Sequence, residues 1–258
     1  MTLLRARSVL LSCSLLFAAS AHAEKVTIAA AADLKFAMDE VVGTFKKTSP
    51  ADEVDVIYGS SGKFSTQLQQ GAPYDMFFSA DITFPRELAK AGLAASDVKP
   101  YAVGRIVLWS ASMDASKMTL ASLTDPRITR IAIANPKHAP YGKRAEEALR
   151  ASGLWEKVEP KLVYGENIAQ TAQYAQTGNA QVGIVALALA VNPELASKGT
   201  YWLIPDKLHA PLEQAFIITK RAGRNAAARR FADYMSSKPA RAVMTRYGFV
   251  LPGEAAGK

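Results

Sequence analysis

The sequence contains one cysteine among its 258 residues, Cys13, so no disulfide can form within the chain. Histidine is almost as rare, with three in all. His138 and His209 have no Cys, Asp or Glu nearby at the spacing of a zinc site. A fold held by neither disulfides nor a structural metal depends on a hydrophobic core. A chain of this length is long enough to bury one or two such cores.

The sequence also lacks the motifs of common catalytic and nucleotide-binding sites. Residues 59–62 (Gly-Ser-Ser-Gly) do not have glycines on both sides of a serine at the spacing of a nucleophile elbow. Gly62 and Lys63 do not form a phosphate loop, because Ile57 stands where its first glycine belongs and Phe64 follows the lysine. No glycine-rich dinucleotide fingerprint follows the first predicted strand. These absences argue against an enzyme, and we predict no catalytic residue and no cofactor.

Residues 1–23 have the pattern of a signal peptide. Two arginines precede an apolar run over residues 9–19, and Ala-His-Ala stands directly before Glu24. The apolar run is too short to span a bilayer. We therefore expect cleavage after Ala23, removal of the cysteine with the leader, and a periplasmic mature chain of residues 24–258.

The charge balance is basic but carries no concentrated patch. The whole chain has 31 Lys and Arg against 23 Asp and Glu, and the predicted mature chain keeps 29 of the basic residues, for a net charge of +6. The basic residues are scattered, with Arg229-Arg230 as the longest pure run of arginine. A mildly positive surface favours encounter with anions. We expect no nucleic-acid partner for an exported protein of this kind.

Short apolar runs alternate with amphipathic segments along the mature chain. Residues 34–47, for example, place Leu34, Met38 and Phe45 on one helical face. The alternation predicts an α/β protein with mostly parallel sheets. The predicted strands are 25–30, 53–58, 74–78, 103–109, 130–134, 161–164, 181–186, 201–204 and 214–219. The predicted helices are 34–47, 62–70, 83–91, 141–151, 167–177, 186–190, 224–236 and 238–246.

Three turns carry the clearest functional signal, because each joins a short apolar strand to a helix. They lie at residues 26–34, 54–64 and 131–142. A helix N-terminus has free backbone N–H groups and the positive end of the helix dipole. Several such ends that meet in one cleft form a site for a small anion without any charged side chain.

At these turns the sequence resembles the periplasmic molybdate-binding proteins of ABC importers, which have the type II periplasmic binding protein fold. The resemblance runs from the Ala-Ala-Ala-Asp-Leu opening to residues 246–249 (Arg-Tyr-Gly-Phe). It implies an α/β fold with two lobes joined by a two-stranded hinge, each lobe a mostly parallel sheet flanked by helices. The first lobe is then formed by residues 24–103 and 213–258, and the second by 104–212. The motifs that carry the resemblance are residues 59–62 (Gly-Ser-Ser-Gly), 71–81 (Gly-Ala-Pro-Tyr-Asp-Met-Phe-Phe-Ser-Ala-Asp), 135–142 (Asn-Pro-Lys-His-Ala-Pro-Tyr-Gly) and 183–185 (Gly-Ile-Val).

The resemblance also implies the residues that hold the oxyanion. They would touch the oxygen atoms of molybdate and would not be direct ligands of the metal. Neutral hydroxyl and N–H donors suit this role, because a buried counter-charge is costly to desolvate. The implied contacts are Asp33 through its backbone N–H, Ser61, Tyr141 and the backbone of Ile168, with Ser60 and Ala186 as further candidates.

Plainer roles stay open for several of these residues. Ser61 suits a helix cap, and Tyr141 suits a packed aromatic with its hydroxyl in water. Lys63 and Lys137 are expected to be solvated charges at the rim. Ala186 stands where some members of the family carry a tyrosine, and the Tyr141 hydroxyl would replace that donor from another direction.

Asp33 departs from the family pattern, in which many members carry Ser or Thr at this turn. A carboxylate that faced a dianion would repel it. We expect the carboxylate to cap its own helix by accepting from residue 35 or 36, with its backbone N–H towards the ligand. The alternative is that the carboxylate accepts a proton carried by the ligand, as in hydrogen phosphate.

The resemblance implies a monomeric binding protein that captures molybdate and delivers it to the membrane permease of an ABC importer. Tungstate has nearly the same size and charge, so the sequence does not separate the two ligands. A binding protein for another oxyanion, such as phosphate or sulfate, is the alternative. A secreted hydrolase or an adhesion module is a third interpretation.

Overall fold

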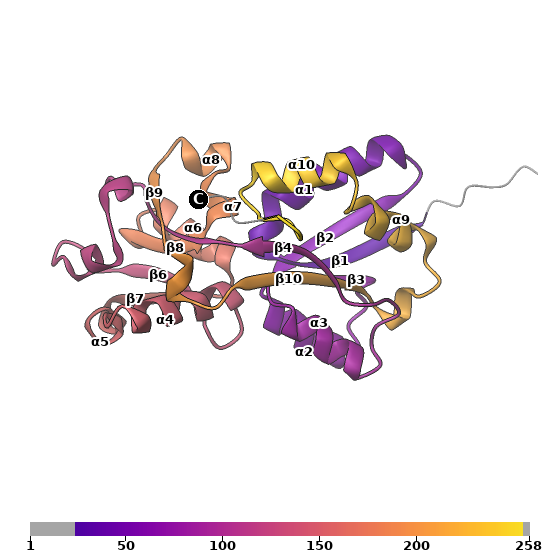
Figure 1. Ribbon diagram of the computed structural model, residues 1–258, viewed down its shortest axis with the longest axis horizontal. Coiled ribbons are helices and arrows are strands. Elements are labelled where there is room, and N and C mark those ends of the chain that lie inside the picture. Colours follow the sequence, from indigo (N-terminus) through magenta and orange to yellow (C-terminus); the bar gives the residue numbers. More distant parts are fainter. Residues whose placement is uncertain (1–23, 255–258) are drawn as a thin grey trace, which may run out of the picture.

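The protein consists of two five-stranded sheets that lie side by side, each with helices packed against it (Figure 1). The computed structural model describes residues 24–254. The first sheet has the strand order β2-β1-β3-β10-β4 and, with its helices, forms the first lobe. The second sheet has the order β7-β6-β8-β5-β9 and forms the second lobe. The two-lobe α/β architecture expected from the sequence is confirmed.

The bounds of the elements follow the predicted alternation closely. The strands are β1 (Lys25–Ala31), β2 (Glu53–Gly59), β3 (Met76–Ser79), β4 (Lys99–Gly104), β5 (Ile106–Ser110), β6 (Ile131–Ala134), β7 (Leu162–Gly165), β8 (Val182–Ala186), β9 (Thr200–Leu203) and β10 (Leu212–Ile218). The α-helices are α1 (Lys35–Thr48), α2 (Ser61–Gln69), α3 (Thr83–Lys90), α4 (Pro140–Ala151), α5 (Trp155–Val158), α6 (Ile168–Gln176), α7 (Leu187–Ala190), α8 (Pro193–Ala196), α9 (Ala226–Tyr234) and α10 (Lys238–Arg246). The short 3-10 helices are η1 (Ala32–Leu34), η2 (Ala115–Lys117), η3 (Leu120–Thr124), η4 (Glu159–Lys161), η5 (Asp206–Leu208) and η6 (Lys220–Ala222).

Four of the five strands in each sheet run in the same direction, so the mostly parallel sheets expected from the sequence are confirmed, with one reversed strand in each. The pairs β1–β2, β1–β3, β6–β7 and β6–β8 are parallel. The pairs β3–β10, β4–β10, β5–β8 and β5–β9 are antiparallel. The reversed strands are β10 in the first sheet and β5 in the second. Each is the first strand that the chain forms after it passes from the other lobe.

The first sheet is covered on both faces, and its strands alternate between two hydrophobic clusters. In β1, Ile28 and Ala30 pack with α1, α9 and α10, while Ala29 points to the other face. On that other face, Phe64 of α2 and Leu88 of α3 complete a smaller cluster. This period of two is the side-chain geometry of a strand buried on both sides.

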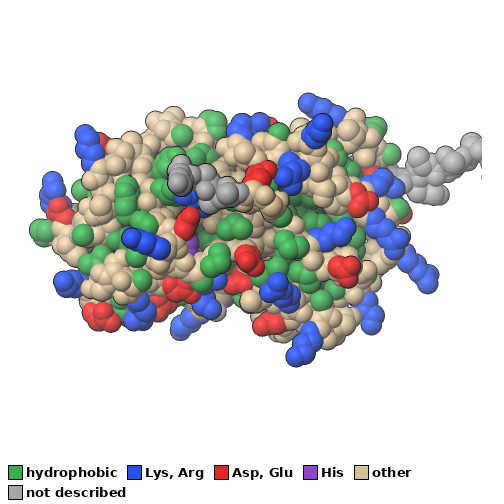
Figure 2. All heavy atoms as spheres, in the orientation of Figure 1, with side chains coloured by type: hydrophobic (Ala, Val, Ile, Leu, Met, Phe, Trp, Pro, Cys, Tyr) green, Lys and Arg blue, Asp and Glu red, His purple; other side chains and the backbone are tan. Residues whose placement is uncertain are grey.

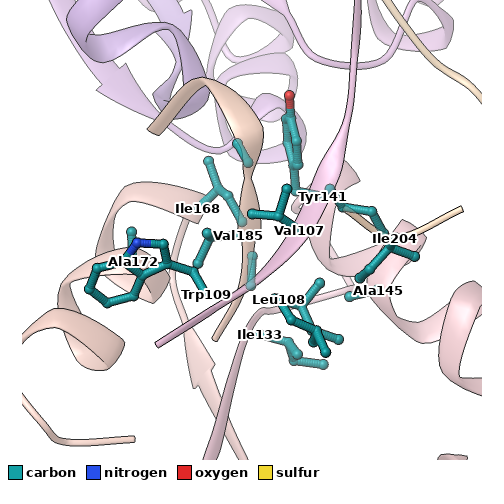
Figure 3. Packing of buried hydrophobic residues seen from close by; sticks show 14 of the residues in the cluster. Val107, Leu108, Trp109, Ile133, Tyr141, Ala145, Ile168, Ala172, Val185 and Ile204 are labelled. Atoms are coloured by element: carbon teal, nitrogen blue, oxygen red, sulfur yellow. The ribbon is translucent and has the colours of Figure 1, made fainter. Parts of the chain in front are cut away.

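The second lobe has its own core, which is built around β5, β6 and β8. Trp109 and Leu108 are fully buried there, with Ile133 close by (Figure 3). Tyr141 lies at the edge of this cluster, and its hydroxyl points away from the apolar side chains (Figure 3). The core therefore fixes the ring of Tyr141 and leaves its polar atom outside.

The chain passes between the sheets twice. The first passage is Arg105, which separates β4 of the first sheet from β5 of the second. The single strand predicted over residues 103–109 is therefore wrong, since its two halves belong to different sheets. The second passage lies between β9 and β10, and β10 pairs with β4. In Figure 1, β4 and β10 lie side by side in the first lobe, and the chain connects each of them to the second lobe.

Basic side chains are dispersed over the face seen in Figure 2 and are interleaved with acidic ones. Within residues 24–254, no helix is long and apolar enough to cross a membrane. The predicted signal peptide, residues 1–23, lies outside the described residues.

Candidate functional site

Four strand-to-helix turns meet where the two lobes face each other. In the first lobe, β1 leads into η1 and α1, and β2 leads into α2; in the second lobe, β6 leads towards α4 and β7 towards α6. All four strands are in parallel pairs, so their carboxyl ends lie at corresponding edges of the sheets. Ligands of open α/β sheets bind at such edges. The helix starts of both lobes are thus directed to one place.

A small cavity lies at this place, with walls from both lobes and a volume of ≈ 10 Å³. Among the residues the structure describes, its lining contains no Lys, Arg or His. Asp33 is the one ionisable acid in the wall. The lining residues are Ala31, Ala32, Asp33, Gly59, Ser60, Ser61, Ala80, Ala139, Pro140, Tyr141 and Ile168.

Ser61 is fully buried and is the first residue of α2. Its Oγ accepts a hydrogen bond of 3.0 Å from the backbone N–H of Ala80. A hydroxyl has one proton to donate, and this bond leaves it unused. Ser61 is therefore not a helix cap, and its donor is available on the cavity wall.

Ser60 is the N-cap residue of α2, but its side chain does not cap the helix. Its Oγ lies 3.0 Å from Nδ1 of His138 in the second lobe. Ser60 thus joins the lobes at the edge of the cavity.

Ile168 occupies the first position of α6, and its side chain is buried. Asn167 caps this helix, because its Oδ1 accepts from the N–H groups of Ala169 and Gln170. The N–H of a first helical residue has no partner inside its own helix. The Ile168 N–H is therefore a backbone donor at the cavity.

The expectation that the Asp33 carboxylate caps its own helix is wrong. No side-chain cap hydrogen bond forms at the start of η1 or α1. The Asp33 Oδ2 instead accepts from the Tyr141 hydroxyl at 2.9 Å and from Nε2 of Gln214 at 2.7 Å. Tertiary partners, which the sequence pattern does not specify, have replaced the local cap.

Burial dominates the electrostatics of Asp33. The side chain is fully buried, and the loss of hydration raises its pKa to about 6. The hydrogen bonds from Gln214 and Tyr141 lower the pKa, but their effect is smaller than that of burial. Burial and the nearby Asp33 carboxylate also raise the pKa of the Tyr141 hydroxyl well above its usual value. Tyr141 is consequently a neutral proton donor at any physiological pH.

Two residues outside the sequence motifs, Gln214 and Tyr101, complete the hydrogen-bond network around Asp33. The Tyr101 hydroxyl donates to Oε1 of Gln214 at 2.7 Å, which turns Nε2 of Gln214 towards Asp33. Both residues are buried. The available signal was a single uncharged polar residue, Gln214, inside the apolar run of β10, because a buried amide requires partners.

Direct contacts close the mouth of the cavity. The Gly62 N–H donates to the carbonyl oxygen of His138 at 2.9 Å, and the Lys63 ammonium pairs with Glu166. Lys63 therefore stands at the rim, as expected. Deeper between the lobes, Nη2 of the buried Arg144 lies 3.4 Å from Oδ2 of Asp81.

The remaining candidates take other positions. Ala186 is buried at the end of β8 and does not line the cavity. Within residues 24–254, no group of three or more His, Cys, Asp or Glu side chains is arranged to hold a metal ion. The cavity instead offers uncharged donors from both lobes, which suits an anion that accepts hydrogen bonds.

A fold of two lobes with a donor-lined cavity between them defines a solute-binding protein of the periplasmic type. A sequence profile described as bacterial extracellular solute-binding protein matches residues 26–250. The chain belongs to this family, which is a transport family and not a family of enzymes.

Several relatives share most of the length of the chain. A molybdate-binding protein ModA from Rhodobacter capsulatus is 36% identical over 249 residues, which cover 96% of each chain. One from Azotobacter vinelandii is 37% identical and covers 92% of this chain and 94% of its own. The solved structure of the Azotobacter vinelandii periplasmic molybdate-binding protein superposes with a TM-score of 0.81 at 32% identity and covers 88% of this chain and 99% of its own.

Proposed function

We propose that this protein captures molybdate between its two lobes and delivers it to the membrane permease of an ABC importer. The observation that carries the proposal is the set of helix N-termini from both lobes that meets at one cavity. Ser61 and Tyr141 add hydroxyls to these backbone donors. The relatives of high coverage are named as molybdate-binding proteins, which favours this oxyanion over phosphate or sulfate.

The chemistry of the cavity fits a fully deprotonated tetrahedral dianion. Molybdate has oxygen atoms that only accept hydrogen bonds, and the donors of the proposal are Ser61, Tyr141 and the backbone N–H groups of Ile168 and Asp33. Preorganised neutral dipoles stabilise the anion without a buried counter-charge, whose desolvation is costly. Tungstate fits the same description and is the second ligand of the proposal.

The proposal also includes the location, the oligomeric state and the lobe boundaries of the protein. Residues 1–23 are a signal peptide cleaved after Ala23, and the mature protein is a periplasmic monomer that binds its ligand without chemical change. Residues 24–103 and 213–258 form the first lobe, and residues 104–212 form the second. These limits are supported by Arg105, which separates β4 of the first sheet from β5 of the second, and by β10 of the first sheet, which begins at Leu212 after β9 of the second.

A thermal-shift panel on the mature chain tests the proposal with molybdate, tungstate, sulfate, phosphate and chromate. A ligand at 100 times its dissociation constant stabilises the folded state by about 2.7 kcal/mol. For a chain of this size the melting temperature then rises by roughly 5–10 °C. We expect this shift with molybdate and tungstate. No shift with either anion would refute the proposal, and a larger shift with sulfate or phosphate would support the alternative oxyanion.

A further inference from the structure

The hydroxyl of Tyr141 is committed to Asp33 in this structure. Tyr141 Oη donates to Oδ2 of Asp33 over 2.9 Å, from the second lobe to the first. A phenol carries one proton and makes one donated hydrogen bond. Tyr141 therefore cannot donate to an oxyanion in the cavity and to the Asp33 carboxylate at the same time.

Gln214 fixes the position of both partners. Its Nε2 donates to Oδ2 of Asp33 at 2.7 Å and lies 3.1 Å from Oη of Tyr141. Its Oε1 accepts from the Tyr101 hydroxyl, so a flipped amide would place an oxygen against the carboxylate. The hydroxyl of Tyr141 is thus held at the cavity wall. It can donate its proton either to the Asp33 carboxylate or to an acceptor in the cavity.

Asp33 is a strong acceptor because it is buried with no cation beside it among residues 24–254, although the backbone N–H groups of Asp33 and Leu34 also lower the pKa of its carboxylate. The side chain is fully buried, and its Oδ1 has no hydrogen-bond partner among the residues the structure describes. The groups that contact its Oδ2 are Tyr141 from α4 and Gln214 from β10, with Tyr101 of β4 behind Gln214. None of these groups is a cation that would neutralise the carboxylate.

We propose that Asp33 is an internal competitor of the ligand, which holds the Tyr141 proton when the lobes close without an oxyanion and yields it to an oxyanion that binds. This inference rests on the proposed function. Asp33 is then a positioning residue that acts through Tyr141. Asp33 therefore weakens oxyanion binding and speeds oxyanion dissociation, because the oxyanion accepts the Tyr141 proton only when the Tyr141–Asp33 hydrogen bond breaks.

A double-mutant cycle measured by calorimetry with molybdate on the mature chain separates this role from simple charge repulsion. The variants are Asp33→Asn, Tyr141→Phe and the pair together. Removal of the negative charge tightens binding of a dianion in either background. Only in the chain with Tyr141 is a donor also held less tightly, because an amide oxygen is a weaker acceptor than a carboxylate, so the Asp33→Asn gain is larger there by about fivefold or more.

A matched control comes from a second tyrosine–carboxylate pair in the first lobe. The Tyr58 hydroxyl donates to Oδ1 of Asp39, and neither residue lines the cavity. Asp39→Asn makes the same chemical change there, and we expect the affinity for molybdate to stay unchanged. Asp33→Ser repeats the cycle with a different side chain, so the outcome does not depend on the folding of one variant.

The outcomes of the cycle are distinct. Equal gains in both backgrounds, within about twofold, would show that Asp33 acts by charge alone and would overturn the inference. A loss of affinity in Asp33→Asn and Asp33→Ser would overturn it as well. If the parent chain does not bind molybdate, the proposed function itself is refuted. The expected Tyr141-dependent gain, with a slower dissociation rate in Asp33→Asn, supports the inference.

Discussion

The backbone N–H of Gly62 in the first lobe donates a hydrogen bond to the carbonyl oxygen of His138 in the second, over 2.9 Å. Gly62 is the second residue of α2, next to Ser61 of the cavity. A Cβ at this position would lie 2.7 Å from the same carbonyl oxygen. The absence of a side chain at Gly62 therefore allows the lobes to approach each other at the cavity mouth.

Gly62→Ala is expected to weaken oxyanion binding by roughly tenfold or more, because even a small misfit at a closely packed contact costs 1–3 kcal/mol. The effect should appear mainly as a faster dissociation rate, measured by stopped-flow fluorescence. Gly43→Ala is the control, since Gly43 lies in α1 with nothing within 4 Å of an added Cβ. It should stabilise the fold by about 1 kcal/mol and leave affinity unchanged. An unaltered dissociation rate in Gly62→Ala would contradict this account.

Ser61→Ala is expected to weaken oxyanion binding by about 1–3 kcal/mol, because a charged acceptor loses one donor. The structure adds a second effect: the variant leaves the buried N–H of Ala80 without its acceptor, so the unliganded protein is also destabilised. Calorimetry and urea unfolding measure the two effects separately. Ser65→Ala, one turn further along α2 and outside the cavity lining, is the matched control with unchanged affinity. Equal affinities of Ser61→Ala and wild type would place the donor elsewhere.

The backbone donor of Ile168 is tested by a pair of substitutions at the first position of α6. Ile168→Pro removes the N–H, and proline is well tolerated at a first helical position. The preceding Asn167 already has an extended conformation, with φ −150° and ψ 175°, as a residue before proline requires. Ile168→Ala loses the packed side chain but keeps the N–H. We expect Ile168→Pro to bind molybdate at least about tenfold more weakly than Ile168→Ala; similar affinities would exclude this N–H as a contact.

Asp33 should make stability depend on pH. Burial raises its pKa from 3.8 to about 6, so the folded protein holds more protons than the unfolded chain between these values. The free energy of unfolding contributed by this group is therefore highest below about pH 4, falls as pH rises, and is lost above about pH 6. The total is on the order of 3 kcal/mol.

Asp33→Asn removes this dependence without a change of shape. Urea unfolding from pH 4 to pH 7 should show the variant gaining stability over the wild type as pH rises, with most of the change by pH 6. A difference that stays constant across this range would show that Asp33 titrates near its ordinary value in the folded protein.

The sequence by itself determined the local features of this protein. Alternating apolar runs fix strands β1, β2 and β6, and the period of residues 34–47 fixes α1, because side-chain direction follows from backbone geometry over a few residues. The same local patterns placed Ser61 and Ile168 at helix starts. Both positions line the cavity, because helices that follow parallel strands begin at the same edge of their sheet and these edges of the two sheets face each other.

Only the tertiary structure decided what Asp33 does. An aspartate at a helix start predicts a cap, but its acceptor oxygen is occupied by Tyr141 and Gln214, 108 and 181 residues away. The sequence predicted the passage between the lobes near residue 103, and tertiary strand pairing set the break between the two sheets at Arg105. A buried carboxylate bonds to whichever donors the closed lobes bring to it. That choice depends on how the lobes meet, which no short stretch of sequence encodes.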